Sequence, residues 1–212
     1  MNLLNRHIIY LIGIGGIGMS ALARYFLQQG KIIAGYDRTP SSITRELEDA
    51  GAYIHYSEDV TTVPMVVQTA PNNDILVIYT PAISQESPLF QYVKNQKFSI
   101  FKRAEVLGFI CNDYPTIAVA GTHGKTTISS LIAHIIHYAQ QDCIAFLGGI
   151  IKNYHSNFIY NEKPHWAVAE ADEYDRSFLH LSPMAAVITA IDPDHLDIYK
   201  TYDALKQAYS DF

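Results

Sequence analysis

The stretch Pro115-Thr-Ile-Ala-Val-Ala-Gly121-Thr-His-Gly-Lys-Thr-Thr127 joins an apolar run to a glycine turn, a lysine and two threonines. Residues 115–120 predict a buried strand, and the apolar spacing of residues 128–136 predicts a helix directly after the turn. In this order, the backbone N–H groups of the turn and of the helix N-terminus face the phosphates of a nucleotide. Lys125 would neutralise the terminal phosphates, and the Thr126 hydroxyl would ligate Mg²⁺. The stretch therefore predicts a triphosphate-binding α/β unit.

This turn is a shortened variant of the general phosphate-binding loop, G-x-x-x-x-G-K-[ST]. Val119 stands where the first glycine of that pattern belongs, and Gly121 follows two residues later. An ordinary glycine turn with a surface lysine is the alternative, but the flanking strand and helix favour a nucleotide. The predicted ATP-binding residues are Gly121, Thr122, His123, Gly124, Lys125, Thr126 and Thr127.

A second glycine-rich turn lies near the N-terminus. The apolar run His7-Ile-Ile-Tyr-Leu-Ile12 predicts a strand, and Gly13-Ile-Gly-Gly-Ile-Gly18 follows it as a G-x-G-x-x-G turn in front of a helix over residues 19–27. Residues 32–36 predict the next strand, and Asp37 at its end is placed to bind a ribose hydroxyl. The pattern favours a diphosphate ligand, which NAD, FAD and UDP-sugars all offer. Glycines that serve only helix–strand packing are the alternative.

The rest of this half alternates in α/β fashion. Residues 75–79 predict a buried strand and residues 102–110 a short helix. The turn Thr80-Pro-Ala-Ile83 directly follows that strand, so we expect it to face the same crevice as the first glycine turn. For residues 63–73 we expect a loop with a short extra strand.

The turn residues of Asn112-Asp-Tyr-Pro115 indicate a domain boundary. The sequence thus predicts a Rossmann-like domain over residues 1–112. An incomplete α/β domain of the phosphate-loop type is predicted over residues 113–212.

Composition limits the class of partner. The net charge is −6 and the 15 basic residues form no run, so no electrostatic footprint for nucleic acid or for an anionic membrane is present. Cys111 and Cys143 lie far apart in sequence, which favours a reducing cytoplasm over a disulfide framework. Residues 6–23 imitate a signal peptide, but their glycines interrupt the apolar run. We expect a cytoplasmic protein with small-molecule ligands; its oligomeric state is not predicted.

Acidic residues follow two further predicted strands. Trp166-Ala-Val-Ala169 leads into Glu170-Ala-Asp-Glu173, and a second buried strand over residues 184–190 leads into Asp192-Pro-Asp-His-Leu-Asp197. Carboxylates at strand ends beside phosphates suit Mg²⁺, and the imidazole of His195 would bind a second cation or orient a carboxylate. A solvated acidic loop and a structural histidine are the alternatives.

Together these motifs resemble the Mur ligases of peptidoglycan synthesis, and the resemblance covers the whole chain. The motifs that carry it are Gly13 to Gly18, Thr80-Pro-Ala-Ile-Ser84, Lys102-Arg-Ala-Glu105, Ala120 to Thr127, Glu170-Ala-Asp-Glu-Tyr-Asp175 with Ser177-Phe-Leu179, and Asp194-His-Leu-Asp197.

The resemblance implies an ATP-dependent ligase that joins L-alanine to the lactyl carboxylate of UDP-N-acetylmuramate through an acyl phosphate. Lys125, Glu170 and His195 would be the catalytic residues. Thr126 and Glu170 would hold Mg²⁺, and His195 with Glu170 would serve a second cation. The residues implied for the UDP-sugar site are Gly13, Gly15, Gly16, Ile17, Gly18, Asp37, Ser84, Arg103 and His123.

Two departures from the family pattern leave alternatives open. Mur ligases have three domains and more than twice this length, so we expect an N-terminal fragment that binds the UDP-sugar, binds ATP weakly and does not turn over. Tyr174 stands where alanine-adding members often carry serine, which keeps open a related ligase that attaches murein tripeptide. A nicotinamide-dependent oxidoreductase would leave the second loop unexplained, and a non-catalytic nucleotide-binding module is the remaining alternative.

Overall fold

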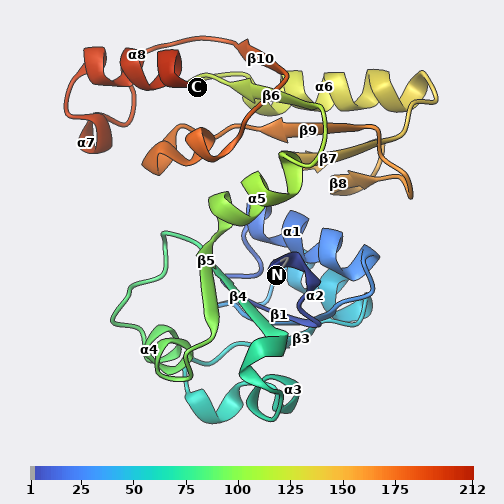
Figure 1. The fold of residues 1–212 in the computed structure, drawn as a ribbon, viewed down its shortest axis with the longest axis vertical. Coiled ribbons are helices and arrows are strands. Elements are labelled where there is room, and N and C mark those ends of the chain that lie inside the picture. Colours follow the sequence, from blue (N-terminus) through green and yellow to red (C-terminus); the bar gives the residue numbers. More distant parts are fainter. Residues whose placement is uncertain (1–2) are drawn as a thin grey trace. The chain divides into compact units, whose positions relative to one another are not determined.

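The computed structural model describes residues 3–212, which form two compact units that divide between Arg103 and Ala104. Each unit has its own five-stranded sheet (Figure 1). This division lies one helix before the predicted boundary at residue 112, because α5 (Arg103–Cys111) packs within the second unit. There Gly108 lies so close to the His180 backbone that an added Cβ would be 2.5 Å from its carbonyl oxygen.

The first unit is built on a parallel sheet with the strand order β3-β2-β1-β4-β5. Ile8 pairs with Ile32 on one side and with Ile75 on the other, so β1 lies at the centre. The chain reverses its strand order between β1 and β4, where loops at the carboxyl ends of both strands form a ligand crevice in such folds. The strands are β1 Ile8–Ile12, β2 Ile32–Tyr36, β3 Tyr53–His55, β4 Ile75–Tyr79 and β5 Ser99–Lys102.

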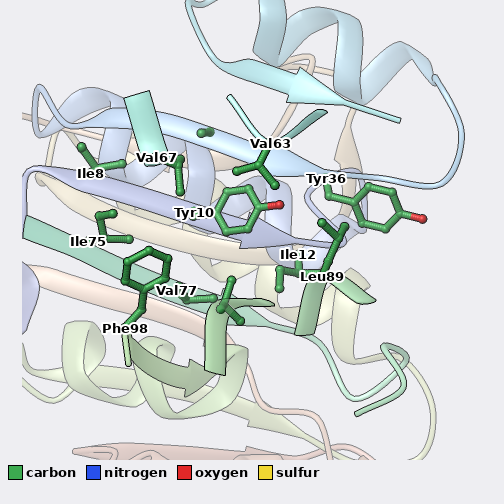
Figure 2. Close-up of a cluster of buried hydrophobic side chains, with 12 residues drawn as sticks. Ile8, Tyr10, Ile12, Tyr36, Val63, Val67, Ile75, Val77, Leu89 and Phe98 are labelled. Carbon is green, nitrogen blue, oxygen red and sulfur yellow. The ribbon is translucent and has the colours of Figure 1, made fainter. Parts of the chain in front are cut away.

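Alternate residues of β1 bury their side chains in one core cluster of this unit (Figure 2). Tyr10 is fully buried there, beside Val67 of α3 and Leu89 of α4. The intervening residues of β1, Ile9 and Leu11, are buried as well, so β1 is covered on both faces, as its continuous apolar run indicates. The helices are α1 Ile17–Gln28, α2 Ser42–Asp49, α3 Met65–Gln68 and α4 Pro88–Asn95.

The extra strand expected within residues 63–73 is wrong. These residues instead hold α3 and the start of a short 3-10 helix, Asn72–Asp74. Pro64 and Pro71 precede the two helical turns, where a missing N–H costs least. The apolar pair Val63 and Val67 is buried from a helical turn rather than from a strand.

The second unit has the strand order β10-β6-β9-β7-β8, in which only the β7–β8 pair is antiparallel. Ala133 of α6 packs on Cys143 and Val168 of this sheet. The strands are β6 Thr116–Ala120, β7 Cys143–Ile151, β8 Ser156–Tyr160, β9 Trp166–Glu170 and β10 Ala185–Ile188. The helices are α6 Lys125–Tyr138, the 3-10 segment Tyr174–His180, α7 Leu196–Tyr199 and α8 Tyr202–Asp211.

The strand predicted near residues 184–190 is present as β10, but its predicted burial is wrong. Ala185 and Ala186 are exposed, and Ile188 is 44% exposed. The reason is its place in the sheet: β10 lies at the edge and pairs with β6 alone among the described strands.

The helices and the two cysteines of the structure can be compared with what the composition predicts. None of the described helices combines the length and the apolar character needed to cross a bilayer. Cys111 and Cys143 are both free thiols inside the second unit. Burial raises the pKa of Cys143 to about 11, so this thiol stays protonated at neutral pH.

Candidate functional site

The first glycine turn connects β1 to α1 and touches the turn after β4. Gly13 has a φ of +89°, which favours glycine, and Gly16 caps the helix. A Cβ added at Gly13 would come within 2.8 Å of the Thr80 methyl group. The structure therefore places residues 80–83 against the glycine turn, as the strand order requires.

Asp37 binds the backbone of this turn. The Gly15 N–H donates to Asp37 Oδ2 over 2.7 Å, and the Thr39 N–H donates to Oδ1 over 3.3 Å. Gly15 has no room for a Cβ, which would lie 2.8 Å from both Asp37 Oδ2 and the Thr44 methyl group. A carboxylate thus occupies one of the N–H groups that the sequence assigns to a diphosphate.

A cation stands at the start of α1. A Cβ at Gly18 would lie 3.0 Å from Cδ and from Nη1 of Arg103, so the guanidinium lies against the first turn of the helix. Ser84 is exposed in the loop after Thr80, and its hydroxyl accepts a hydrogen bond from the Glu86 N–H over 3.1 Å. The structure brings the glycines, Asp37 and Arg103 together, with Ser84 on the adjoining loop.

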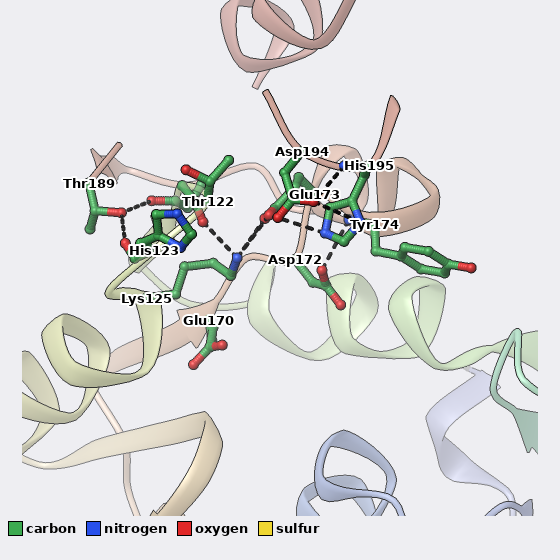
Figure 3. Close-up of polar contacts among 12 residues, drawn as sticks. Thr122, His123, Lys125, Glu170, Asp172, Glu173, Tyr174, Thr189, Asp194 and His195 are labelled. Atoms are coloured by element: carbon green, nitrogen blue, oxygen red, sulfur yellow. Dashed lines mark hydrogen bonds and ion pairs between the residues drawn. The ribbon is translucent and has the colours of Figure 1, made fainter. Parts of the chain in front are cut away.

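The second glycine turn leaves β6 and begins α6. Gly121 and Gly124 have φ values of +126° and +78°, both in the region that favours glycine. Hydrogen bonds in both directions tie Thr122 to the segment after β10. Its N–H donates to the Ala190 carbonyl over 2.9 Å, and its hydroxyl accepts from the Asp192 N–H over 3.1 Å. Thr189 adds a bond from its hydroxyl to the His123 carbonyl (Figure 3). The conformation of this turn therefore depends on β10.

Lys125, the first residue of α6, is bound entirely within the chain. Its ammonium donates to the Gly121 carbonyl over 2.6 Å and to Glu173 Oε2 and Oε1 over 2.8 and 3.0 Å. The Glu173 side chain is only 1% exposed, and the Lys125 side chain is 15% exposed. In Figure 3 the lysine points to Glu173 and not to Glu170. The lysine predicted to meet phosphate thus meets a buried carboxylate.

Thr126 and Glu170 approach the same pair of glycines in β7. The Gly148 N–H donates to Glu170 Oε2 over 3.0 Å, and a Cβ at Gly149 would lie 3.1 Å from the Thr126 methyl group. A Cβ at Gly148 would collide with the Glu170 carboxylate. A hydroxyl and a carboxylate are oxygen ligands of the kind that Mg²⁺ prefers, so these residues fit the ion.

No group of three or more histidine, cysteine, aspartate or glutamate side chains among residues 3–212 is arranged to hold a metal. A magnesium ion at Thr126 and Glu170 would therefore take most of its ligands from water and phosphate oxygens, as it commonly does.

His195 lies beside Glu173 and Asp194. Its Nε2 is 3.7 Å from Glu173 Oε1, and its Nδ1 is 3.9 Å from Asp194 Oδ1. The ring of Tyr174 meets the imidazole edge-on at 5.4 Å between centroids. The carboxylates within ion-pair distance of the imidazole are therefore Glu173 and Asp194, whereas the sequence pairs it with Glu170.

The side chains of His123 and Thr127 are exposed. The His123 imidazole is 72% exposed, with Nε2 3.6 Å from Asp192 Oδ2. Thr127 is exposed on the first turn of α6. Both side chains are open to solvent beside the lysine.

Sequence reasoning missed three residues that shape these turns. Glu173 was seen only as part of an acidic run, and neither Thr189 nor Thr44 carried a motif. A buried carboxylate beside a phosphate-loop lysine has no spacing signal, and the two left-handed residues that follow it, Asp175 and Arg176, are not glycines that would mark a turn. The contacts of Thr44 and Thr189 arise only when strands far apart in sequence pair.

Residues 8–115 match the Mur ligase family, catalytic domain, and residues 119–212 match the Mur ligase middle domain. The chain belongs to the Mur ligase family. The two matched domains of this Mur ligase chain together contain both glycine turns. An oxidoreductase built on the first turn alone would leave the second turn unexplained.

Curated relatives of this Mur ligase chain are named UDP-N-acetylmuramate–L-alanine ligase. The protein from Cytophaga hutchinsonii is 47% identical over 100% of this chain and 46% of its own length. The protein from Flavobacterium johnsoniae is 49% identical with the same coverage, 100% and 46%. The chain thus spans about half the length of the curated relatives it matches.

Solved structures agree on the fold. The UDP-N-acetylmuramate-alanine ligase of Thermotoga maritima superposes with a TM-score of 0.85 at 28% identity, covering 96% of this chain and 46% of that one. The UDP-N-acetylmuramate:L-alanyl-gamma-D-glutamyl-meso-diaminopimelate ligase of Neisseria meningitides gives a TM-score of 0.85 at 23% identity, covering 97% and 67%. These structures confirm the fold class expected from the sequence, a Rossmann-like unit followed by a second α/β unit.

Proposed function

We propose that this chain supplies the UDP-sugar-binding and ATP-binding parts of a ligase that joins L-alanine to the carboxylate of UDP-N-acetylmuramate. In this proposal residues 1–112 bind the UDP-sugar, and residues 113–212 form the first part of the ATP-binding domain. The observation that carries the proposal is the position of Lys125 at the N-terminus of α6, directly after a turn with two positive-φ glycines. Thr126 and Glu170 approach adjacent glycines of β7. The names of the curated relatives support the choice of substrates.

In this proposal each residue has a task that follows from charge. A carboxylate and a triphosphate repel each other, so Lys125 and the N-terminus of α6 lower the cost of bringing them together. Thr126 and Glu170 would hold Mg²⁺, which would supply positive charge that offsets the charge of the phosphates. His195 orients the reacting carboxylate or a second cation. The carboxylate attacks the γ-phosphate of ATP and ADP leaves, which gives an acyl phosphate. The amine then attacks the acyl carbon, and phosphate leaves as the amide bond forms.

In the first unit, the UDP diphosphate would bind at the glycine turn of residues 13–18, where α1 starts. Arg103 adds a positive charge beside that helix start. Asp37, which accepts from Gly15, would exchange this bond for one with a sugar hydroxyl when the diphosphate takes the N–H. Ser84 completes the proposed contacts of this unit with the UDP-sugar.

Titration of the purified chain with UDP-N-acetylmuramate tests the first half of this proposal. We expect a rise in melting temperature with UDP-N-acetylmuramate and none with NADH, because ligands stabilise the state they bind. Stabilisation by NADH alone would overturn the assignment. Mixing the chain with ATP, UDP-N-acetylmuramate and L-alanine should release no phosphate, since we propose that ligation needs more of the protein than these residues.

A murein tripeptide is the alternative acceptor, and Tyr174 is the residue that favours it. Its ring covers one edge of the His195 imidazole, next to the groups proposed to activate the carboxylate. A panel of L-alanine and murein tripeptide, supplied to a protein that carries this chain with the length of its relatives, decides between the acceptors. Release of phosphate only with the tripeptide would replace L-alanine in the proposal, and release with neither would favour a non-catalytic module.

A further inference from the structure

The ammonium of Lys125 has no donor left for a phosphate in this structure. An ammonium carries three N–H donors. Here one acceptor is the Gly121 carbonyl at 2.6 Å, and the other two are the oxygens of Glu173 at 2.8 and 3.0 Å. A carboxylate that binds through both oxygens presents the lysine with the charge and the paired acceptors that a terminal phosphate would present.

The Glu173 backbone is fixed from several sides. The Tyr199 hydroxyl donates to the Glu173 carbonyl over 2.5 Å, and the Arg176 N–H donates to the same oxygen over 3.0 Å. The chain then passes through Asp175 and Arg176, whose φ values are +53° and +54°. Residues other than glycine adopt this region at a cost in free energy, so the surrounding contacts hold Glu173 in place.

Burial makes the exchange of partners costly. With only 1% of its side chain exposed, Glu173 cannot replace Lys125 with bulk water unless its segment moves. His195 Nε2, 3.7 Å from Oε1, is the basic group that stays beside the carboxylate when the lysine leaves. The carboxylate and the nucleotide therefore compete for one ammonium.

From these contacts we propose that Glu173 is an internal stand-in for the terminal phosphate of the nucleotide: it holds Lys125 in the ligand-free chain and must release it before the triphosphate binds. The proposal rests on the proposed ATP site and adds a residue that sets its affinity. If Glu173 holds Lys125 in about ten of every eleven molecules, only the remaining molecule can bind ATP through the lysine. The apparent dissociation constant for ATP is then about tenfold higher than that of the released site.

The substitution Glu173→Gln tests this competition, because it keeps the shape of the side chain and removes its charge. We expect calorimetric titration with ATP in EDTA to give a dissociation constant about tenfold lower than that of the unchanged chain. Asp172→Asn is the matched control. It removes one negative charge at the preceding residue and leaves the carboxylate on Lys125 intact, so we expect a change below about twofold.

A second readout needs no nucleotide. In the unchanged chain Lys125 should react slowly with an amine-directed acetylating reagent, because its ammonium is paired and mostly buried. Peptide mass spectrometry should find faster labelling of Lys125 in Glu173→Gln and unchanged labelling in Asp172→Asn. If the glutamine variant does not fold, Glu173→Asp takes its place, because it shortens the side chain and keeps the charge. Its ATP affinity and its Lys125 labelling rate should lie between those of the unchanged chain and those expected for Glu173→Gln.

The outcomes separate this inference from the function on which it rests. If the unchanged chain binds ATP and Glu173→Gln binds it equally or more weakly, Glu173 is not a competitor and only the inference is overturned. If Glu173→Gln binds ATP and the unchanged chain does not, the inference is supported in its strongest form. If neither protein binds ATP at millimolar concentration, the proposed ATP site itself is overturned.

Discussion

Both glycine turns have a carboxylate of the chain where a phosphate is proposed to bind, but the two carboxylates are held differently. In the first turn, Asp37 accepts a hydrogen bond from the neutral Gly15 N–H and is partly exposed. In the second turn, Glu173 binds the charged Lys125 ammonium and is 1% exposed. The same strand, turn and helix order thus supports a partly exposed hydrogen bond in one unit and a buried ion pair in the other.

The difference predicts how each turn exchanges its carboxylate for a ligand. A partly hydrated carboxylate that leaves a backbone N–H is compensated by water, so Asp37 should yield easily. A buried charge that loses its partner pays for desolvation without compensation, so Glu173 should not. Substitutions on the second turn should therefore cost folding stability, whereas those on the first should mainly cost ligand affinity.

The largest expected effect follows from Lys125→Met, which leaves Glu173 buried without its cation. Removing one partner of a buried pair costs about 3–5 kcal/mol. The chain has one tryptophan, Trp166, and it lies in β9 of the second unit. Urea unfolding followed by its fluorescence should show the midpoint falling to lower urea concentration.

The double variant Lys125→Met with Glu173→Gln controls for lost packing. Removing both charges should recover most of the lost stability, because neither side chain is then a buried ion without a partner. If the double variant is no more stable than Lys125→Met alone, the pair carries no coupling energy and the contrast between the two turns disappears.

Next in size is Gly15→Ala in the first turn. Its Cβ would come within 2.8 Å of Asp37 Oδ2 and of the Thr44 methyl group, and such overpacking costs about 1–3 kcal/mol. We expect the affinity for UDP-N-acetylmuramate to fall about tenfold or more in calorimetry, with Trp166 fluorescence unfolding unchanged. Gly30→Ala strains a backbone with a φ of +70° but meets no atom within 4 Å, so it should leave that affinity intact. Equal losses in both variants would mean that general instability, not the Asp37 contact, weakens binding.

The fold was predictable where apolar runs are continuous. The central strands β1, β4 and β6 are buried along most of their length, so the sequence shows them plainly. It does not show β3, which has three residues and buries only His55. It also overstates the burial of β10, because a strand at the edge of a sheet has the same apolar composition as a central one.

The candidate site was predictable as motifs but not as pairings. The sequence marked Lys125, Glu170 and His195 because each follows a strand end. It did not show that Glu173 would bind the lysine, since residues 170–173 all lie within reach of the same sheet edge. The left-handed backbone that follows Glu173, at Asp175 and Arg176, was also not visible in the sequence, because neither position is a glycine.

A smaller effect is expected from Thr189→Val at the end of β10. The single O–H of Thr189 is shared between the His123 carbonyl and the Ala120 carbonyl, and together these bonds contribute about 1 kcal/mol net. Valine keeps the shape but not these bonds, so we expect ATP affinity to fall severalfold while UDP-N-acetylmuramate affinity is unchanged. Calorimetry with both ligands measures this. Unchanged ATP affinity would show that the turn keeps its conformation without β10.

The first unit buries a neutral polar network rather than an ion pair. His55 Nε2 lies 2.8 Å from the Tyr10 hydroxyl, and its Nδ1 lies 2.9 Å from the Thr62 hydroxyl and 3.0 Å from the Ser57 carbonyl. Desolvation lowers the pKa of His55 below its ordinary 6.5, while the bond to the Ser57 carbonyl opposes this in part. At neutral pH the network therefore carries no charge, unlike Lys125 and Glu173.

The smallest expected effect is a dependence of the first unit's stability on pH. Between the lowered pKa of folded His55 and the 6.5 of the unfolded chain, the unfolded chain binds the proton that the folded unit excludes. The contribution of His55 is therefore complete above pH 6.5 and is lost as the pH falls below it. Hydrogen exchange of the β1 and β3 amides between pH 5 and 7.5, corrected for intrinsic rates, measures this slope. The variant His55→Gln should show a flatter dependence of stability on pH, because glutamine does not titrate. An equal slope in that variant would assign the pH dependence to other groups. The two units would then be alike in their response to acid.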